Sequence, residues 1–407
     1  MHNTKTLAAL TLLAVGLAAC SSHGVHTSEG LAHARQRLDA MKAATEYEMA
    51  EQQFLAGDLP KAARTIERAI ALSPTVTKVH VLKSRILMEQ GFLEPARVSI
   101  KNALTINPDD PDAHYYAALI DERQSITESA LDHYLTASKL DPANPLYTLA
   151  AADMLTDLAR TDEANSLLEE ARERFPSSAA LRQAQAHLAM LQNDNERAAT
   201  LLNDARLLAP DDRAILEDYA RSLVACERWP EAEFHIARLL QTAPKEQPPR
   251  RDLQRTHARC LLQLNRPVDA RAILLSLTSG SEGVSDVQSW IDLAIVSTRL
   301  NETARARSAA NRVIGLAPTR PEGHLLLAAS LRAEHRLQQA LDATDVAIKH
   351  APDNATAWVM RGVLLRDMSR TDDAEQAFAT ALRLNPNADH AETLLTGAVH
   401  VADPVAP

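Results

Sequence analysis

The fifteen histidines are the side chains of this chain best suited to bind a metal, but their spacing argues against a metal site. Two histidines on one helix share a metal when they lie three or four residues apart and a carboxylate completes the ligand set. His23 and His26 have that spacing, but they lie in a short stretch of small and polar residues, which we interpret as a flexible tether. We therefore predict that the chain binds no metal.

Motifs of catalytic and nucleotide-binding sites are absent from the sequence. It has no glycine-rich phosphate loop ending in Lys-Ser or Lys-Thr, no His-Glu-x-x-His, no Cys-x-x-Cys and no Gly-x-Ser-x-Gly. The formal charge of −10 and the pI near 5.8 argue against a basic face for nucleic acid. The sequence thus predicts neither an enzyme nor a nucleic-acid-binding protein.

Three arginines and three tyrosines are the main candidates for binding a partner. Arg255 and Arg259 lie four residues apart on one helix face, where like charges cost a few tenths of a kcal/mol unless an acid offsets them. Together with Arg221 they either bind an acidic partner or pair with Glu217 and Asp218. The aromatic candidates either contact a peptide or pack against neighbouring helices; they are Tyr47, Tyr115 and Tyr116, with Phe54, Leu119 and Leu149 nearby.

A period of 34 residues sets the elements that position these side chains. Nine prolines follow it, with one irregular interval: Pro74, Pro108, Pro142, Pro176, Pro210, Pro244, Pro318, Pro352 and Pro386. Each has an alanine twelve residues before it and another small residue twelve before that. One further small pair marks a repeat without the proline, so the chain has ten repeats. The small residues occupy positions 8 and 20 of each repeat: Ala50, Ala62, Ser84, Ala96, Ala118, Ala130, Ala152, Ala164, Ala186, Ala198, Ala220, Ala232, Ala258, Ala270, Ala294, Ala306, Ala328, Ala340, Gly362 and Ala374.

Each repeat is predicted to be a hairpin of two helices. Two helices cross closely only where neither carries bulk, which explains the small residues at positions 8 and 20. At position 15 the chain must turn, and six of the ten repeats have Gly, Asn or His there, which tolerate left-handed backbone. The proline at position 32 ends the second helix because it cannot continue a helix. The repeats begin near residues 43, 77, 111, 145, 179, 213, 251, 287, 321 and 355.

This pattern resembles the tetratricopeptide repeat, a helix-turn-helix of about 34 residues. The resemblance covers 43–388 and departs from the family at position 4, where tryptophan occurs only as Trp290 and Trp358. Three histidines are expected to fill this semi-buried site in other repeats: His80, His114 and His324. The resemblance implies an all-α, right-handed superhelical solenoid of about ten repeats. In such solenoids the first helices line a concave surface through positions 2, 5, 9 and 12, and the partners are proteins or peptides.

The N-terminus resembles that of a bacterial lipoprotein. Residues 1–19 read as a signal peptide whose apolar run, Leu7 to Leu17, is too short to span a membrane. The four residues that end at Cys20 resemble the lipobox, which implies a covalent diacylglycerol and an N-acyl lipid on Cys20 and no other cofactor. Ser21, in place of aspartate, favours the periplasmic face of the outer membrane. An ordinary signal peptide with a chance cysteine is the alternative.

Several segments flank or interrupt the repeats. Residues 20–28 are expected to be the lipid-anchored flexible tether, and 29–42 a lead-in helix that runs into the first repeat. Small insertions fall near 245–251 and 278–285. They are either tolerated loops, since loop length costs little entropy, or a kink or partner contact at the seventh repeat.

The C-terminus and the two remaining cysteines complete the sequence. Residues 389–401 are expected to form a capping helix that covers the last repeat, and 402–407 a disordered tail. Cys226 and Cys260 lie on neighbouring first helices. They either form a disulfide of poor geometry or stay as two buried thiols.

Together these features predict a membrane-anchored periplasmic lipoprotein that acts as a protein–protein interaction scaffold. The resemblance suggests an envelope assembly, such as pilus, secretion, outer-membrane or exopolysaccharide machinery, with envelope proteins or peptides as partners. The alternative is a glycan-binding component of polysaccharide export, which would use the three tyrosines as platforms.

Overall fold

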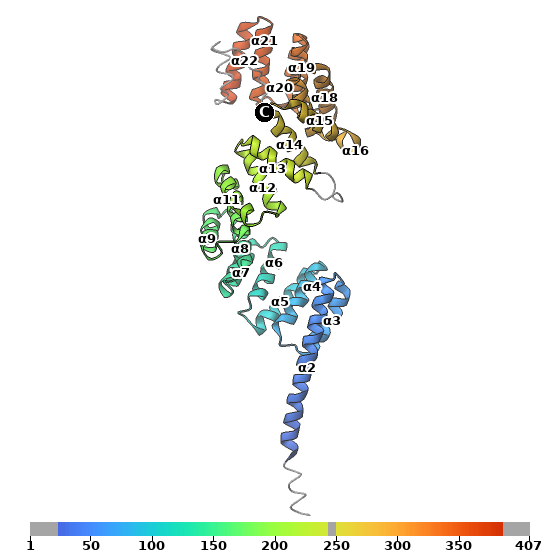
Figure 1. Ribbon diagram of the computed structural model, residues 1–407, viewed down its shortest axis with the longest axis vertical. Coiled ribbons are helices and arrows are strands. Elements are labelled where there is room, and N and C mark those ends of the chain that lie inside the picture. Colours follow the sequence, from blue (N-terminus) through green and yellow to red (C-terminus); the bar gives the residue numbers. More distant parts are fainter. Residues whose placement is uncertain (1–22, 243–249, 386–407) are drawn as a thin grey trace, which may run out of the picture. The chain divides into compact units, whose positions relative to one another are not determined.

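The computed structural model describes residues 23–242 and 250–385, which form helices and no strands (Figure 1). The predicted all-α fold of repeated helical hairpins is thereby confirmed. The expected signal peptide, Cys20, the capping helix and the tail lie outside the described residues. The chain divides within α10 (Ala179–Leu191) into two compact units. We call residues 23–188 the N-terminal unit and residues 189–385 the C-terminal unit.

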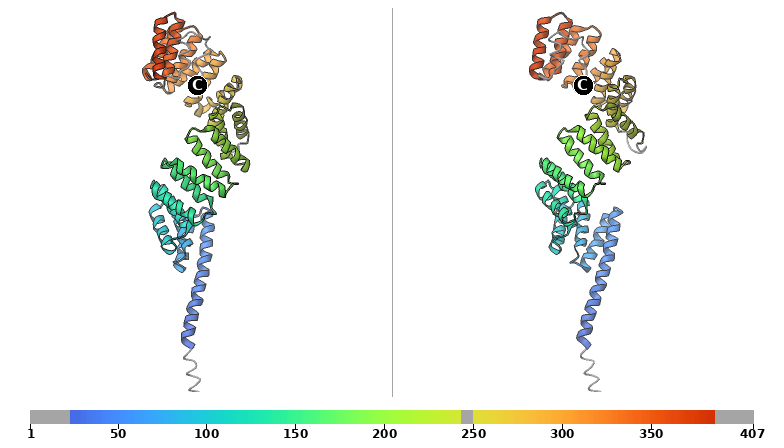
Figure 2. Two further views of the ribbon diagram at one scale, coloured as in Figure 1. Left: turned by 90° about the vertical axis from the view of Figure 1, so that its left-hand side faces the viewer. Right: turned by 60° about the vertical axis from the view of Figure 1, so that its left-hand side comes forward.

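The N-terminal unit stacks first and second helices of successive repeats, each on its neighbours in sequence (Figures 1 and 2). Its first helices are α2 (His23–Leu55), α4 (Thr77–Glu89), α6 (Pro111–Arg123) and α8 (Pro145–Asp157). Its second helices are α3 (Leu59–Leu72), α5 (Leu93–Ile106), α7 (Thr127–Leu140) and α9 (Thr161–Arg174).

The C-terminal unit continues the same alternation. Its first helices are α12 (Arg213–Ala225), α14 (Arg251–Gln263), α17 (Val287–Arg299), α19 (Pro321–Ala333) and α21 (Ala355–Asp367). Its second helices are α11 (Asn195–Leu208), α13 (Trp229–Gln241), α15 (Pro267–Leu277), α18 (Thr303–Leu316), α20 (Leu337–His350) and α22 (Thr371–Leu384). From α4 onward, every first helix begins at the residue where the period places a repeat start.

The small residues at positions 8 and 20 lie at the helix crossings. All twenty are buried, and the eighteen alanines and Ser84 are at most 2 % exposed. Ser84 keeps its hydroxyl satisfied at such a crossing by donating to the carbonyl oxygen of Ala96, 3.0 Å away. In the last repeat Gly362 faces the Phe378 ring, and a Cβ on Gly362 would lie only 2.5 Å from Cε1 of that ring. In this repeat the Phe378 ring thus fills the space that the methyl group of an alanine would take.

The turn at position 15 has the same geometry in all ten repeats. Every residue at this position has a positive φ, between 55° and 82°: Gly57, Gly91, Ser125, Ala159, Asn193, Glu227, Asn265, Asn301, His335 and Ser369. The next residue donates its N–H to the carbonyl five residues earlier, as when Arg160 bonds to Leu155 at 2.8 Å. This closure satisfies the carbonyl groups that the end of the first helix leaves open. Even Ala159 and Glu227 adopt it, so the closure overrides residue preference.

The lead-in helix begins earlier than expected. α2 starts at His23, so residues 23–28 of the expected tether are helical, and the helix runs without a break into the first repeat. Extending an existing helix fixes one residue for each new hydrogen bond, which costs less than starting a helix. The part of α2 that packs in the first repeat therefore provides a formed helix onto which the preceding residues add at low cost.

Histidine or tryptophan at position 4 fastens several of the first helices to the preceding turn. The Nε2 atom of His80 lies 2.8 Å from the carbonyl oxygen of Pro74, and Trp358 Nε1 donates to that of Pro352 at 2.9 Å. The same contact with the preceding proline carbonyl is made by His114 and His324. Histidine replaces tryptophan here because either ring can donate to this carbonyl oxygen.

The insertion near 278–285 folds as one short helical turn, α16 (Gly280–Gly283). Trp290 at position 4 donates from Nε1 to the carbonyl oxygen of Gly283 at 3.0 Å. A Cβ at Gly283 would lie 2.3 Å from the carbonyl oxygen of Leu277, so only glycine fits. This insertion is thus packed against the eighth repeat.

Candidate functional site

A groove of about 650 Å³ lies within the C-terminal unit. Its walls come mainly from the first helices α12, α14, α17, α19 and α21, and more than half of their lining residues occupy positions 2, 5, 9 and 12. These are the positions that the resemblance assigns to a concave surface. The apolar part of the groove is aliphatic; at these positions it consists of Val224, Leu262, Ile291, Ile295 and Leu325.

Arginines line the same groove beside the aliphatic side chains. Arg221 is 63 % exposed in its side chain and donates to Oδ1 of Asp218 at 2.9 Å. Arg299 is exposed, and it makes no ion pair with the residues that the structure describes. The predicted pairing with Asp218 therefore holds for Arg221. Both guanidinium groups keep donors that face solvent and can meet an acidic group.

Glu217, the other acid expected to pair with these arginines, is occupied by different partners. It accepts from Arg213 Nε at 3.1 Å and from Arg250 Nη1 at 3.0 Å. Arg250 lies in the insertion between the sixth and seventh repeats, so this insertion supplies a cation to the groove wall.

Arg255 and Arg259 pair with acids of the eighth repeat, and the expectation that they would use Glu217 and Asp218 is wrong. Arg259 makes a two-pronged contact with Asp292 at 3.1 Å, and Arg255 lies 4.0 Å from the same carboxylate. Asp286 is 3.9 Å from Arg255 on its other side. Because the repeats stack, Asp292 on the first helix of the next repeat lies closer to these arginines than Glu217 and Asp218 do. Residue spacing along a single helix does not reveal this contact.

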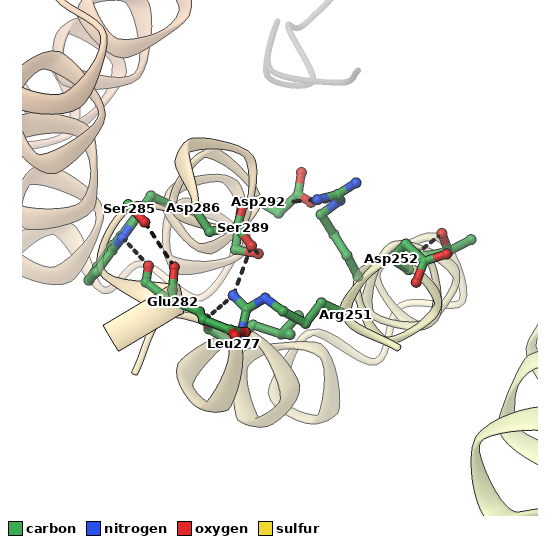
Figure 3. A network of polar contacts seen from close by, with 12 residues as sticks. Arg251, Asp252, Leu277, Glu282, Ser285, Asp286, Ser289 and Asp292 are labelled. Atoms are coloured by element: carbon green, nitrogen blue, oxygen red, sulfur yellow. Dashed lines mark hydrogen bonds and ion pairs between the residues drawn. The ribbon is translucent and has the colours of Figure 1, made fainter. Parts of the chain in front are cut away.

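A polar network fixes the start of α17, the helix that carries Asp292 (Figure 3). Arg251 donates from Nη2 to Oδ2 of Asp286 at 2.9 Å and to the carbonyl oxygen of Leu277 at 2.6 Å. Asp286 caps α17 by accepting from the backbone N–H and the hydroxyl of Ser289, at 3.1 and 2.7 Å. The network ties α14, α15 and α17 together, so the groove wall is held from behind.

Asp292, which lines the groove, and Asp286, which does not, have opposite pKa shifts. Burial raises the pKa of Asp292 above its usual range, and the hydrogen bond and charge of Arg259 offset only part of that effect. Burial also acts on Asp286, but hydrogen bonds from Ser289 and Arg251 outweigh it and lower its pKa. Asp292 therefore depends on Arg259 to remain ionised.

The inner face of the N-terminal unit carries aromatic rings with cations packed on them. Lys78 Nζ lies 4.4 Å from the ring centre of Tyr47. Arg85 lies 4.9 Å from the ring centre of Phe54 and 5.2 Å from that of Tyr116. Such contacts stabilise by about 0.5–1 kcal/mol at exposed sites. Burial and the neighbouring Glu51 raise the pKa of Tyr47 to about 12, so its hydroxyl stays protonated.

Tyr115 packs inside a cluster of tyrosines. Its ring centre lies 5.2 to 5.6 Å from those of Tyr116, Tyr134 and Tyr147. Of the two interpretations left open for the tyrosines, packing against neighbouring helices applies to Tyr115, which contacts these three rings and is half-buried. Tyr47 and Tyr116 are half-buried and keep part of each ring at the surface.

Cys226 and Cys260 are both free thiols, Cys260 fully buried. Burial raises the pKa of Cys260 to about 11, which keeps it as an unreactive thiol. Among the described residues no group of three metal-binding side chains comes together. Within the same residues no helix is long and apolar enough to cross a bilayer.

The comparison with protein families reaches the end of the C-terminal unit. Residues 325–389 match the family model described as the tetratricopeptide repeat. This part of the chain is therefore similar to the tetratricopeptide repeat. Tetratricopeptide repeats serve in general as protein-interaction scaffolds without catalytic activity, and solenoids of this type present extended binding surfaces. The search of curated proteins gave no match.

Several solved structures resemble the chain at low identity, among them proteins described as tetratricopeptide repeat proteins. One is YrrB, described as a repeat protein with an unusual peptide-binding site, with 19 % identity, TM-score 0.38, and coverage of 47 % of this chain and 95 % of that one. Another, from Parabacteroides merdae, has 15 % identity, TM-score 0.39 and coverage of 72 % and 99 %. The Cut9–Hcn1 complex has 11 % identity, TM-score 0.45 and coverage of 88 % and 96 %.

The aliphatic part of the groove was missed in the sequence. Ile291, Ile295 and Leu325 occupy positions 5 and 9 of the eighth and ninth repeats, where the template already placed groove residues. They were not among the predicted binding residues, because isoleucine and leucine in a helix usually indicate core packing. Comparing the ten repeats position by position would have found them.

Proposed function

We propose that the protein is a lipid-anchored scaffold of the bacterial envelope, and that the groove of its C-terminal unit holds a segment of a partner protein. The observation that carries this proposal is the groove itself, whose lining combines aliphatic side chains with exposed arginines. Aliphatic surface favours apolar anchor residues in the bound segment. Arg221 and Arg299 favour acidic residues next to those anchors.

The anchor and the location rest on the sequence. Leu17 to Cys20 supports lipidation of Cys20, and two or three acyl chains would hold the protein at a membrane far more firmly than one. Ser21 supports the periplasmic face of the outer membrane. The scaffold would then serve an envelope assembly, with pilus, secretion, outer-membrane and exopolysaccharide machines as candidates.

Glycan binding is the weaker candidate. Its aromatic platforms would be Tyr47, Tyr115 and Tyr116, but these rings are half-buried, and cations or other rings pack on them. A partner segment bound through aliphatic contacts would account for the groove, and it would not require exposed aromatic rings.

The groove is tested by substituting Ile295→Arg and capturing partners from envelope extract with the tagged full chain. We expect the amount of each specific partner retained to fall at least about tenfold, because a charge replaces the central aliphatic contact. The matched control is Val346→Arg on α20, an aliphatic residue 37 % exposed that does not line the groove. Equal loss with both variants, or with neither, would contradict the proposed groove.

The anchor is tested separately by labelling cells with radioactive palmitate. We expect the wild-type chain to carry label and the Cys20→Ser variant to carry none. A labelled variant, or an unlabelled wild type found in the cytosol, would show that the envelope proposal is wrong while leaving the groove untouched.

A further inference from the structure

The first half of α2 carries an exposed apolar stripe that no repeat uses. Leu31, Leu38 and Met41 are 70 %, 50 % and 69 % exposed. They lie before Ala43, the first residue of α2 that is buried against the repeats. Figure 2 shows this half of α2 running past α3 with no described helix beside it. Among the described helices, α2 packs mainly on α3 and also touches α4.

The spacing of this stripe is that of a coiled-coil seam. Leu31, Ala34, Leu38, Met41 and Thr45 follow one another at intervals of three, four, three and four residues. This is the a and d pattern of a heptad, which forms a narrow seam for one partner helix. Thr45 fits the seam because its hydroxyl donates to the carbonyl oxygen of Met41 at 3.1 Å and leaves the methyl group free.

The positions that flank the seam are basic. Arg35 and Lys42 occupy the e positions and Arg37 a g position, and all three side chains are exposed. None of them makes an ion pair with a residue that the structure describes. Flanking charges of this kind select the partner and its orientation in coiled coils.

We propose that this stripe docks a helix of a partner protein whose flanking positions are acidic. A second copy of the chain would place arginine and lysine against arginine and lysine in either orientation, which is repulsive. A helix that lies in a membrane surface needs a broad apolar face. Here Arg35 and Lys42 lie directly beside Leu31 and Leu38, so the apolar face is only a seam wide. The seam belongs to the N-terminal unit and does not depend on the groove.

The probe for this proposal is a synthetic helical peptide of about three heptads, with leucine at a and d and glutamate at e and g. Its affinity for the full chain in detergent is compared with that of the same peptide carrying lysine at e and g. We expect the glutamate peptide to bind at least about tenfold more tightly. We also expect the Leu31→Gln, Leu38→Gln double variant to lose at least tenfold in that affinity.

Two variants make the test specific. Val98→Gln on α5 replaces an aliphatic residue that is 61 % exposed elsewhere in the same unit, and it should bind both peptides as the wild type does. The triple variant Arg35→Glu, Arg37→Glu, Lys42→Glu should reverse the preference and bind the lysine peptide. All substituted side chains are exposed, and unchanged circular dichroism would show that the helix persists.

Three results would overturn the proposal. The first is equal binding, or no binding, of the two peptides. The second is association with phosphatidylglycerol vesicles that is lost in the Leu31→Gln, Leu38→Gln variant while peptide binding is absent, which would make the stripe a membrane contact. The third is a dimer in sedimentation experiments that dissociates on the same double substitution, which would make the occupant a second copy.

Discussion

The inner faces of the two units use the same helix positions for different contacts. In the N-terminal unit, positions 5, 9 and 12 hold Tyr47, Arg85 and Phe54, and each of the two rings has a cation packed on it. In the C-terminal unit, the same positions hold aliphatic residues such as Ile295 and Leu325, which line a groove. The small residues at positions 8 and 20 are equally buried in both units. The repeat therefore fixes where helices cross, and it leaves the inner face free to change its chemistry.

The largest effect is expected from filling a helix crossing, which should damage both units alike. Ala118→Leu in the N-terminal unit and Ala294→Leu in the C-terminal unit each insert bulk at a site with no exposed surface. We expect each to lower the free energy of unfolding by about 3 kcal/mol, because overpacking forces helices apart. Urea denaturation and hydrogen exchange of the neighbouring repeats measure the loss. Ala225→Leu, at an exposed alanine on α12, is the control. Tolerance of one crossing and not the other would break the common framework.

The next largest effect should depend on pH at the inner face of the C-terminal unit and not at that of the N-terminal unit. The pKa of Asp292 is raised in the folded state, so the stability that this acid contributes falls as pH rises through the range above its usual pKa. Arg259→Ala removes its closest cation and should cost about 2 kcal/mol near pH 7, while Arg255 remains nearby. We expect the cost to shrink as the pH falls toward the usual pKa range of an aspartate, because the raised pKa of Asp292 lets it take up its proton before an ordinary aspartate does.

The matched change in the N-terminal unit is Arg85→Ala. It removes the cation between Phe54 and Tyr116 and should cost about 1 kcal/mol. Since the ring contacts do not titrate between about pH 4 and 7, we expect this cost to be constant there, as measured by urea denaturation at each pH. A pH-dependent cost for Arg85→Ala, or a constant one for Arg259→Ala, would contradict the assignment of the two faces.

The smallest effect concerns the one crossing built from glycine. Gly362→Ala should lower the free energy of unfolding by about 1 kcal/mol, because the new Cβ meets the Phe378 ring. Phe378→Leu in the same chain should recover most of that loss by vacating the space. Thermal unfolding of the single and double variants measures the coupling, and additive effects would show that the two side chains do not share one volume.

Much of the fold followed from local features of the sequence. The period gave the starts of the first helices because each hairpin contacts mainly its neighbours, so few long-range choices remain. The closure at position 15 was harder to predict. Ser125, Ala159, Glu227 and Ser369 carry no preference for positive φ, yet tertiary packing imposes it on them.

The candidate site was predicted less well than the fold. The positions that line the groove were expected, but the partners of Arg255 and Arg259 were not, because Asp292 is 33 residues from Arg259 in sequence. Contacts between repeats depend on how one first helix is rotated against the next. A reading of one helix at a time contains no information on that rotation.

The central claim, that partner binding occurs in the groove of the C-terminal unit, is tested most directly by site-specific photo-crosslinking in cells. A photoreactive amino acid replaces Ile295 in the groove, Tyr116 on the inner face of the N-terminal unit, or Val346 on α20. We expect a discrete crosslinked partner from position 295 and none from position 346. The same partner captured equally from positions 295 and 346, or a partner captured from position 116 alone, would contradict the account.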